Sequence, residues 1–376
     1  MKSDLKIREV SVVLLFCLFL AAMALSFLLV PKKDFSENEK RYLADAPALN
    51  LKNIVEGEFG TEAENWCADH LPARVFFVGL SASADRWMNL QVTKDIYITG
   101  SGRLLERPYP FSAETIRRNL SAINDFAEQT GKTVDLMLVP SAGYFLNEEI
   151  RGLKDEYEDE KIMAAARELA SPGVCMKELL PAFSGFSDPG ALYYKTDHHW
   201  TSLGAYTAAA EYLRSKNRPV LPASAFKVTA EKGFRGTTYS RACFWDFPSE
   251  ELELWDSGGA FEVRFSDRES VFGSLFFPEH LQEPDKYPVY LDGNHPLVTI
   301  ENKSEDAEGS ILVVRDSYAN CMGCFLADSY KTVTMVDLRY YKMPLAELCA
   351  ENDFDDILVL YSVGNFMTDS NIIWIG

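Results

Sequence analysis

The sequence predicts an α/β fold built on a doubly wound, largely parallel sheet. Apolar, strand-like runs alternate with amphipathic helical segments over most of the 376-residue chain. Some of these runs end directly in a polar turn, as in "LVVRDSYAN" (312–320). Strands that alternate with helices are typical of parallel sheets, and the sites of such sheets lie beyond the carboxyl ends of the strands.

Residues 1–30 predict a cytoplasmic tail and a transmembrane anchor. The segment "SVVLLFCLFLAAMALSFLLV" (11–30) carries no charge and follows three basic residues. Its length as a helix is roughly 30 Å, which matches one bilayer core. A cleaved signal peptide is the alternative, because Ala22-Met23-Ala24 is a small-residue cleavage pattern. We expect an uncleaved single-pass anchor in the cell membrane, with the remainder of the chain extracytoplasmic.

Residues 31–100 predict a small connecting subdomain, and residues 101–376 the catalytic domain. The segment "FSENEKRYLADAPAL" (35–49) is polar and lacks helical or strand periodicity, whereas residues 57–87 have apolar positions three and four apart. The segment "DIYITGSGRLLE" (95–106) then alternates and turns at Gly100-Ser101-Gly102, which predicts a hairpin.

The catalytic domain follows as a series of helices and strands. Helices are predicted at 111–132, where Gly131 ends the segment, at 159–173, and at 201–216, where Thr201 is the expected N-cap. Strands are predicted at 133–142, 309–320, 332–341 and 354–366, the last three each running into a polar loop.

The composition excludes some functions. A formal net charge of −19 argues against binding to nucleic acid, which needs a basic surface. No glycine-rich phosphate loop is present, and no soluble cofactor is expected. Six cysteines lie outside the apolar segment, and this even number permits disulfides without showing that they form. We interpret Cys321 and Cys324 as buried thiols, because no second pair accompanies their C-x-x-C spacing.

The segment "YYKTDHHWTSLGAY" (193–206) holds two of the five histidines. In an extended backbone Asp197 and His199 share one face, and His198 points the other way. A carboxylate that orients an imidazole is what a serine nucleophile requires. Ser317 is the candidate nucleophile, because it follows a buried strand in a turn that presents it to a cleft. Asp316 is expected to cap that turn.

Two further features complete the predicted site. In "YSVGNF" (361–366), Gly364 and Asn365 follow another strand, where the Asn365 amide is expected to donate to an oxyanion. Residues 197–199 also have the composition of half a metal site, but the sequence offers no second cluster to complete it, so we expect no metal.

Together these segments resemble the DHHW protein family of the bacterial cell envelope, which is similar to the SGNH-hydrolase-like O-acetyltransferases AlgX and AlgJ. The resemblance rests on "FSENEKRYLADAP", "GEFGTEAENWCADHLPARVFF", "DHHWTSLGAY", "GNHPLV", "RDSYAN" and "VDLRYY". It implies an SGNH-hydrolase-like fold with rearranged motif order, in which the Asp/His block precedes the serine block.

Carried over by residue, the resemblance implies a triad of Asp197, His199 and Ser317, with Arg339 lining the site. Gly364 and Asn365 resemble the oxyanion block of the superfamily. The implied activity is transfer of an acetyl group to a cell-surface or secreted glycan through an acetyl-serine. Acetyl-CoA is absent outside the membrane, so the resemblance also implies a membrane-bound O-acyltransferase partner as acetyl donor.

Two alternatives stay open at this point. The same triad with water as acceptor would give a carbohydrate acetylesterase. A non-catalytic glycan-binding or assembly protein is the third hypothesis, which an intact Asp–His–Ser set disfavours. The sequence does not separate transferase from esterase, because the two differ only in the hydroxyl that reaches the acyl-enzyme.

Overall fold

The structure is a computed structural model that describes residues 2–36, 41–88, 92–93, 95–150, 152, 154–244, 247–283 and 285–376. The chain divides into two compact units. The first comprises Met1–Leu90 and Ser240–Asp246, and the second comprises Gln91–Tyr239 and Phe247–Gly376. The domain boundaries predicted at residues 30 and 100 stay predictions.

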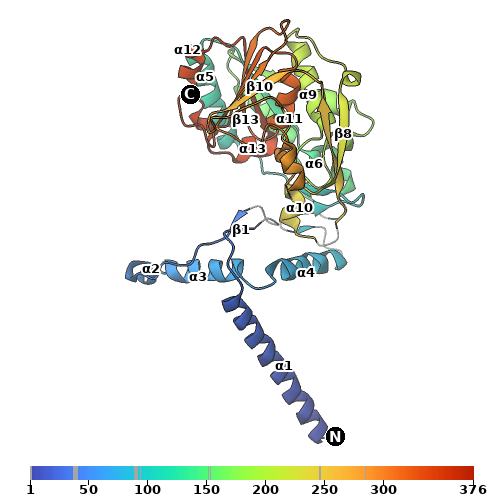
Figure 1. Ribbon diagram of the computed structural model, residues 1–376, viewed down its shortest axis with the longest axis vertical. Helices are drawn as coiled ribbons and strands as arrows, with labels where there is room; N and C mark the ends of the chain where they lie inside the picture. The colour runs from blue at the N-terminus through green and yellow to red at the C-terminus, as the bar shows by residue number, and fades with distance from the viewer. Residues whose placement is uncertain are drawn as a thin grey trace. The chain divides into compact units, whose positions relative to one another are not determined.

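The first unit is helical (Figure 1). Within helix α1 (Lys2–Leu29), the 21 residues Glu9–Leu29 have a mean hydropathy of 2.9, long and apolar enough to cross a membrane as an anchor or to act as a signal sequence. Strands β1 (Phe35–Ser36) and β2 (Arg41–Tyr42) pair, and the helices that follow are α2 (Leu51–Val55), α3 (Glu58–Asp69) and α4 (Arg74–Trp87). The break between α3 and α4 contains Ala73, with φ 56°.

The second unit is built on a mixed sheet in the order β11-β10-β12-β14-β13-β15-β6-β7. The five strands from β14 to β7 are parallel, and β12, β10 and β11 add antiparallel pairs at one edge. The strands are β6 (Val134–Val139), β7 (Val174–Lys177), β10 (Phe261–Phe265), β11 (Val271–Phe272), β12 (Leu297–Asn302), β13 (Ser310–Arg315), β14 (Thr332–Val336) and β15 (Asp356–Ser362).

Helices cover both faces of this sheet, as a doubly wound fold requires (Figure 1). On β13, Ile311 and Val313 face a core shared with α9 (Ser202–Ser215) and α11 (Ala319–Ala327), whereas Leu312 and Val314 face the opposite core. That second core includes α5 (Ala113–Thr130), α7 (Asp159–Leu169), α12 (Leu345–Glu351) and α13 (Val363–Thr368). The predicted fold class is confirmed.

Local signals account for several of these boundaries. Gly131 ends α5 in the left-handed conformation with φ 64°, and the Thr201 side chain caps α9 by accepting from Gly204 N. The hairpin expected at 95–106 is β4 (Ile96–Ile98) paired with β5 (Leu104–Glu106). The remaining elements are β3 (Val92–Thr93), β8 (Lys227–Phe234), β9 (Glu250–Asp256), α6 (Ala142–Leu146), α8 (Leu180–Ser184) and α10 (Thr237–Ala242), with short 3-10 turns between them.

Candidate active site

The loop between Tyr193 and Trp200 presents the two histidines. Tyr193 and Trp200 form an antiparallel bridge that closes the loop at its base. The Glu250 carboxylate accepts hydrogen bonds from the backbone nitrogens of Lys195 at 2.8 Å and Thr196 at 2.6 Å. These contacts fix the backbone of the loop immediately before Asp197.

Asp197 and His199 are joined twice. Asp197 Oδ1 accepts from His199 N at 2.9 Å and lies 2.5 Å from His199 Nδ1. Asp197 Oδ2 accepts from Thr237 N, and a Cβ at Gly236 would lie 2.0 Å from this oxygen. Only a glycine at residue 236 lets the backbone approach the carboxylate so closely.

The serine turn follows β13. Ser317 Oγ lies 2.8 Å from His199 Nε2. Asp316 Oδ1 accepts from Tyr318 N at 2.9 Å, which is the capping role expected of Asp316. Asp316 Oδ2 accepts from Ser362 N and from Asn365 Nδ2, both at 2.8 Å, and so links the serine turn to the end of β15.

Two side chains fix the relation between the loop and the turn. Trp200 Nε1 donates to the carbonyl of Tyr318 at 3.0 Å, and the Tyr318 hydroxyl donates to the carbonyl of His198. Trp200 directly follows His199, and Tyr318 directly follows Ser317. These two neighbours therefore fix the histidine loop against the serine turn.

His198 does not point away from Asp197, contrary to the expectation for an extended strand. Its Nδ1 lies 3.6 Å from Asp197 Oδ1, and its ring lies 3.9 Å from the ring of His199. Residues 195–199 form successive bends, so the alternation of an extended strand does not apply to them.

Burial tunes the imidazole of His199. The side chain is buried, and this desolvation, with the nearby His198, lowers its pKa below the usual value, while Asp197 acts in the opposite direction. Tyr287 stacks on the ring at 3.8 Å between centroids with an interplanar angle of 9°. A neutral imidazole held by an acceptor on one side and facing a hydroxyl on the other is arranged to take a proton from Ser317.

Tyr287 and Asn294 are features that the motif analysis did not assign a role. Asn294 Oδ1 accepts from Arg315 Nη1 and from Asn320 Nδ2, both at 3.1 Å. Asn320 N in turn donates to the carbonyl of Ser317 at 3.2 Å. The side-chain amide of Asn294 is therefore linked through Asn320 to the serine turn. Asn294 belongs to the quoted "GNHPLV" segment, whereas nothing in the sequence marked Tyr287.

The three other predicted residues have distinct positions. Gly364 and Asn365 lie at the start of α13 and line a pocket that also includes Asp197 and His198. Arg339 donates to Asp337 through Nε at 2.9 Å and through Nη2 at 2.5 Å, and it is not among the residues that line this pocket.

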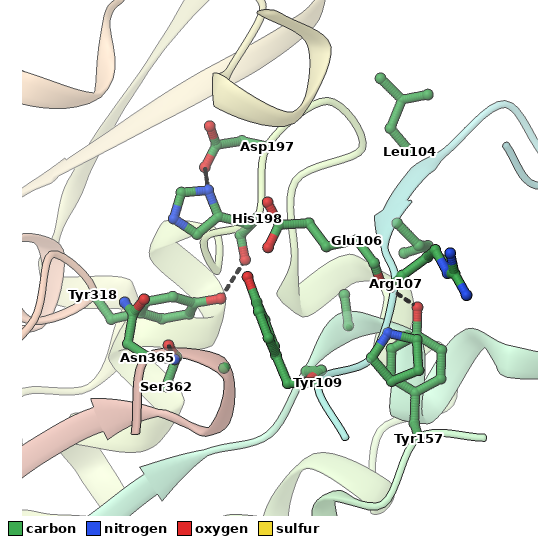
Figure 2. A pocket seen from close by; sticks show the side chains of 16 residues that line it. Leu104, Glu106, Arg107, Tyr109, Tyr157, Asp197, His198, Tyr318, Ser362 and Asn365 are labelled. Atoms are coloured by element: carbon green, nitrogen blue, oxygen red, sulfur yellow. Dashed lines mark hydrogen bonds and ion pairs between the residues drawn. The ribbon is translucent and has the colours of Figure 1, made fainter. Parts of the chain in front are cut away.

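A pocket lies beside the Asp–His–Ser chain at the carboxyl ends of β6 and β15 (Figure 2). We call it the Tyr109 pocket. It is lined by residues 104–109, 141–143 and 197–198, by Tyr157 and Tyr318, and by Ser362, Gly364 and Asn365.

Asp197, His198 and His199 also bring their ligand atoms within 4.8 Å of one another. Both Asp197 oxygens already accept N–H groups, and His199 Nε2 faces Ser317. Asp197 and His199 thus already make hydrogen bonds within the protein, and these bonds have the arrangement that proton transfer from Ser317 requires.

Two protein-family models match parts of this chain. Residues 105–238 match the profile of the "SGNH hydrolase-like domain, acetyltransferase AlgX", and residues 187–336 match that of the "DHHW protein". The comparison with curated proteins found no match.

Two solved structures share the fold. A DHHW family protein from Eubacterium siraeum is 20% identical with a TM-score of 0.64, over 75% of this chain and 95% of that one. Bacillus cereus PatB1, in a structure with a sulfonyl adduct, is 21% identical with a TM-score of 0.63, over 75% of this chain and 99% of that one. The resemblance stated from the sequence is confirmed.

Proposed function

We propose that this chain, which carries a DHHW-family region and an AlgX-like SGNH-hydrolase-like domain, is an extracytoplasmic O-acetyltransferase that acts on a cell-surface or secreted glycan. The observation that carries the proposal is the continuous hydrogen-bonded chain from Asp197 through His199 to Ser317, with separations of 2.5 and 2.8 Å. The relationship to O-acetyltransferases favours acyl transfer as the chemistry of this chain.

The reaction would proceed in two steps. Ser317 Oγ attacks the carbonyl carbon of an acetyl donor, His199 Nε2 takes the serine proton, and the leaving group departs with that proton. A sugar hydroxyl then attacks the acetyl-serine, gives its proton to the same nitrogen, and Ser317 leaves with it. In both steps Asp197 holds Nδ1–H and stabilises the imidazolium. No soluble cofactor takes part.

The oxyanion of each step needs donors beside Ser317. Asn365 was predicted for this role, but one of its amide hydrogens is committed to Asp316. The carbonyl oxygen of Asn294 is held by two donors, which leaves its amide hydrogens directed away from them. We propose that Asn294 and the Ser317 N–H supply the oxyanion hole and that Asn365 positions the turn.

The N-terminal segment supports a role at the membrane. If Glu9–Leu29 is an uncleaved anchor, the site stays near the bilayer, where a membrane-bound O-acyltransferase would deliver the acetyl group. Tethering raises the effective concentration of such a partner without any new contact.

The test uses the full chain in lipid nanodiscs with a chromogenic acetyl ester. We expect an acetylated peptide that contains Ser317, release of the chromophore, and loss of turnover by roughly 10³-fold or more in Ser317→Ala. Ser266→Ala, an exposed serine, is the matched control. Turnover of Ser317→Ala at the wild-type rate would remove the proposed nucleophile.

A second measurement separates transfer from hydrolysis and tests the anchor. Acetyl label that appears on an added glycan indicates a transferase, and label found only in free acetate indicates an esterase. In a deletion strain, the full chain should restore glycan acetylation, whereas a form released from the membrane should not. Equal restoration by both forms would show that the tether has no role.

A further inference from the structure

We infer that the Tyr109 pocket is the acceptor subsite and that it takes one neutral pyranose ring in preference to a uronic acid or a phosphorylated sugar. This inference rests on the proposed function and adds to it the class of sugar.

The position of the pocket fits an acceptor. His198 and Tyr318 line it, and they are the chain neighbours of His199 and Ser317. Asn365, on another wall, is bound through Asp316 to the serine turn. A ring held in this pocket therefore lies next to the groups that would acylate one of its hydroxyls.

The aromatic surface comes mainly from Tyr109. Its side chain is half-buried, and Figure 2 shows its ring between Tyr318 and His198 on one side and Tyr157 on the other. A Cβ at Gly364 would lie 2.8 Å from Tyr109 Cε2, so the glycine allows the ring to lie against the start of α13. An aromatic face with polar groups around it suits a sugar, whose C–H bonds pack on the ring while its hydroxyls bind the rim.

The wall behind Tyr109 is rigid. Tyr157 is buried, and its hydroxyl donates to the carbonyl of Glu106. A Cβ at Gly143 would come within 1.9 Å of the Tyr157 ring, so the ring occupies space that any larger residue at position 143 would fill. A preformed wall reduces the entropic cost of binding, because these side chains need not be ordered when the ligand binds.

The charge of the pocket selects against anions. Its lining includes the carboxylates of Glu106 and Asp197, and Arg107 is its one lysine or arginine among the described residues. Arg107 is already paired with Asp95 at 3.0 Å and with Asp155 at 2.6 Å. Among the described lining residues a uronate or phosphate would therefore meet two carboxylates and no lysine or arginine outside an ion pair, which disfavours an anionic ligand.

Binding is measured on the full-length Ser317→Ala chain in nanodiscs by saturation-transfer NMR. The probes are the methyl pyranosides of glucose, galactose and mannose, each paired with its own uronic acid. We expect at least one neutral glycoside to bind about tenfold or more tightly than its uronate. Equal or tighter binding of the uronates would overturn the charge argument, and no binding by any neutral glycoside would overturn the subsite.

Variants locate the binding. Tyr109→Ala and Gly364→Ala should each weaken binding of the neutral glycoside about tenfold, the first by removing the ring and the second by displacing it. Tyr109→Phe keeps the ring and should bind within about threefold of the parent. Trp374→Ala is the matched control, because Trp374 is an exposed aromatic outside the pocket. Loss of binding in Trp374→Ala but not in Tyr109→Ala would place the sugar elsewhere.

The two proposals fail separately. Because Ser317→Ala is used for binding, the subsite can be confirmed even if the wild-type chain forms no acetyl-serine, and that outcome would refute only the proposed function. Conversely, acetyl-serine formation with transfer unaffected by Tyr109→Ala would refute only the subsite.

Discussion

Replacing Asp316 by asparagine tests the link between the serine turn and the end of β15. The side chain is buried and accepts three hydrogen bonds, one on Oδ1 from Tyr318 N and two on Oδ2 from Ser362 N and Asn365 Nδ2. An asparagine at this position has one acceptor oxygen and one donor group. Whichever way the amide turns, at least one buried donor faces an N–H group.

The magnitude follows from these contacts. An unsatisfied buried donor costs about 1–3 kcal/mol, and each remaining bond loses roughly 1 kcal/mol when its acceptor is no longer charged. We expect Asp316→Asn to lower the free energy of unfolding by about 3 kcal/mol. The turnover of the acetyl ester should fall as well, because the oxygens of Asp316 position both the serine turn and the start of α13.

The assay is urea unfolding of the full chain in detergent, followed by tryptophan fluorescence, alongside acetyl ester turnover. Asp353→Asn is the control, because the Asp353 side chain is 99% exposed and should change stability by no more than about 0.5 kcal/mol. A loss below about 1 kcal/mol in Asp316→Asn, or one equal to that of the control, would show that the three bonds do not act as described.

Four further outcomes are expected. His199→Ala should lose roughly 10³-fold or more of the turnover and His198→Gln much less, and the reverse ranking would exchange their roles. Because His199 must be neutral to accept a proton and its pKa is lowered, the turnover should persist below pH 6.5 and fall as the pH drops through that pKa. His198→Gln removes one of the groups that lower the pKa of His199, so the fall in turnover should then begin at a higher pH. Asn294→Ala should reduce turnover more than Asn365→Ala, and equal losses would argue against Asn294 as an oxyanion donor. Burial raises the pKa of Cys321 to about 12, so a thiol reagent at pH 8 should label the exposed Cys175 at least about 100-fold faster than it labels Cys321. Similar labelling rates for the two cysteines would contradict the burial of Cys321.

Much of the fold was predictable because its signals are local. The apolar periodicity of α5, its end at Gly131 and the cap at Thr201 each depend on residues within a turn or two of the chain. The strand-then-turn form of "LVVRDSYAN" was sufficient to predict that Ser317 lies just beyond the carboxyl end of its strand. The antiparallel strands β10 to β12 were not predicted, because no short-range pattern states which partner an edge strand will take.

The site was predictable in its chemistry and less so in its geometry. The pairing of Asp197 with His199 agrees with the two-residue spacing, yet the loop bends, and His198 lies beside both side chains. Tyr287 lies 88 residues from His199 in sequence numbering and reaches it only through the tertiary fold. Side chains that touch the site from distant segments leave no local pattern, and they are the part that required the structure.

The order of the strands has a consequence for biosynthesis. Strand β6 lies between β7 and β15, so one of its edges has no partner until residues 356–362 have been made. The Asp–His loop also precedes Ser317 by more than a hundred residues. A chain that is synthesised from its N-terminus therefore carries an open apolar strand edge until residues 356–362 have been made. Such an edge invites pairing with other chains, so the incompletely made domain is exposed to aggregation until β15 pairs with β6.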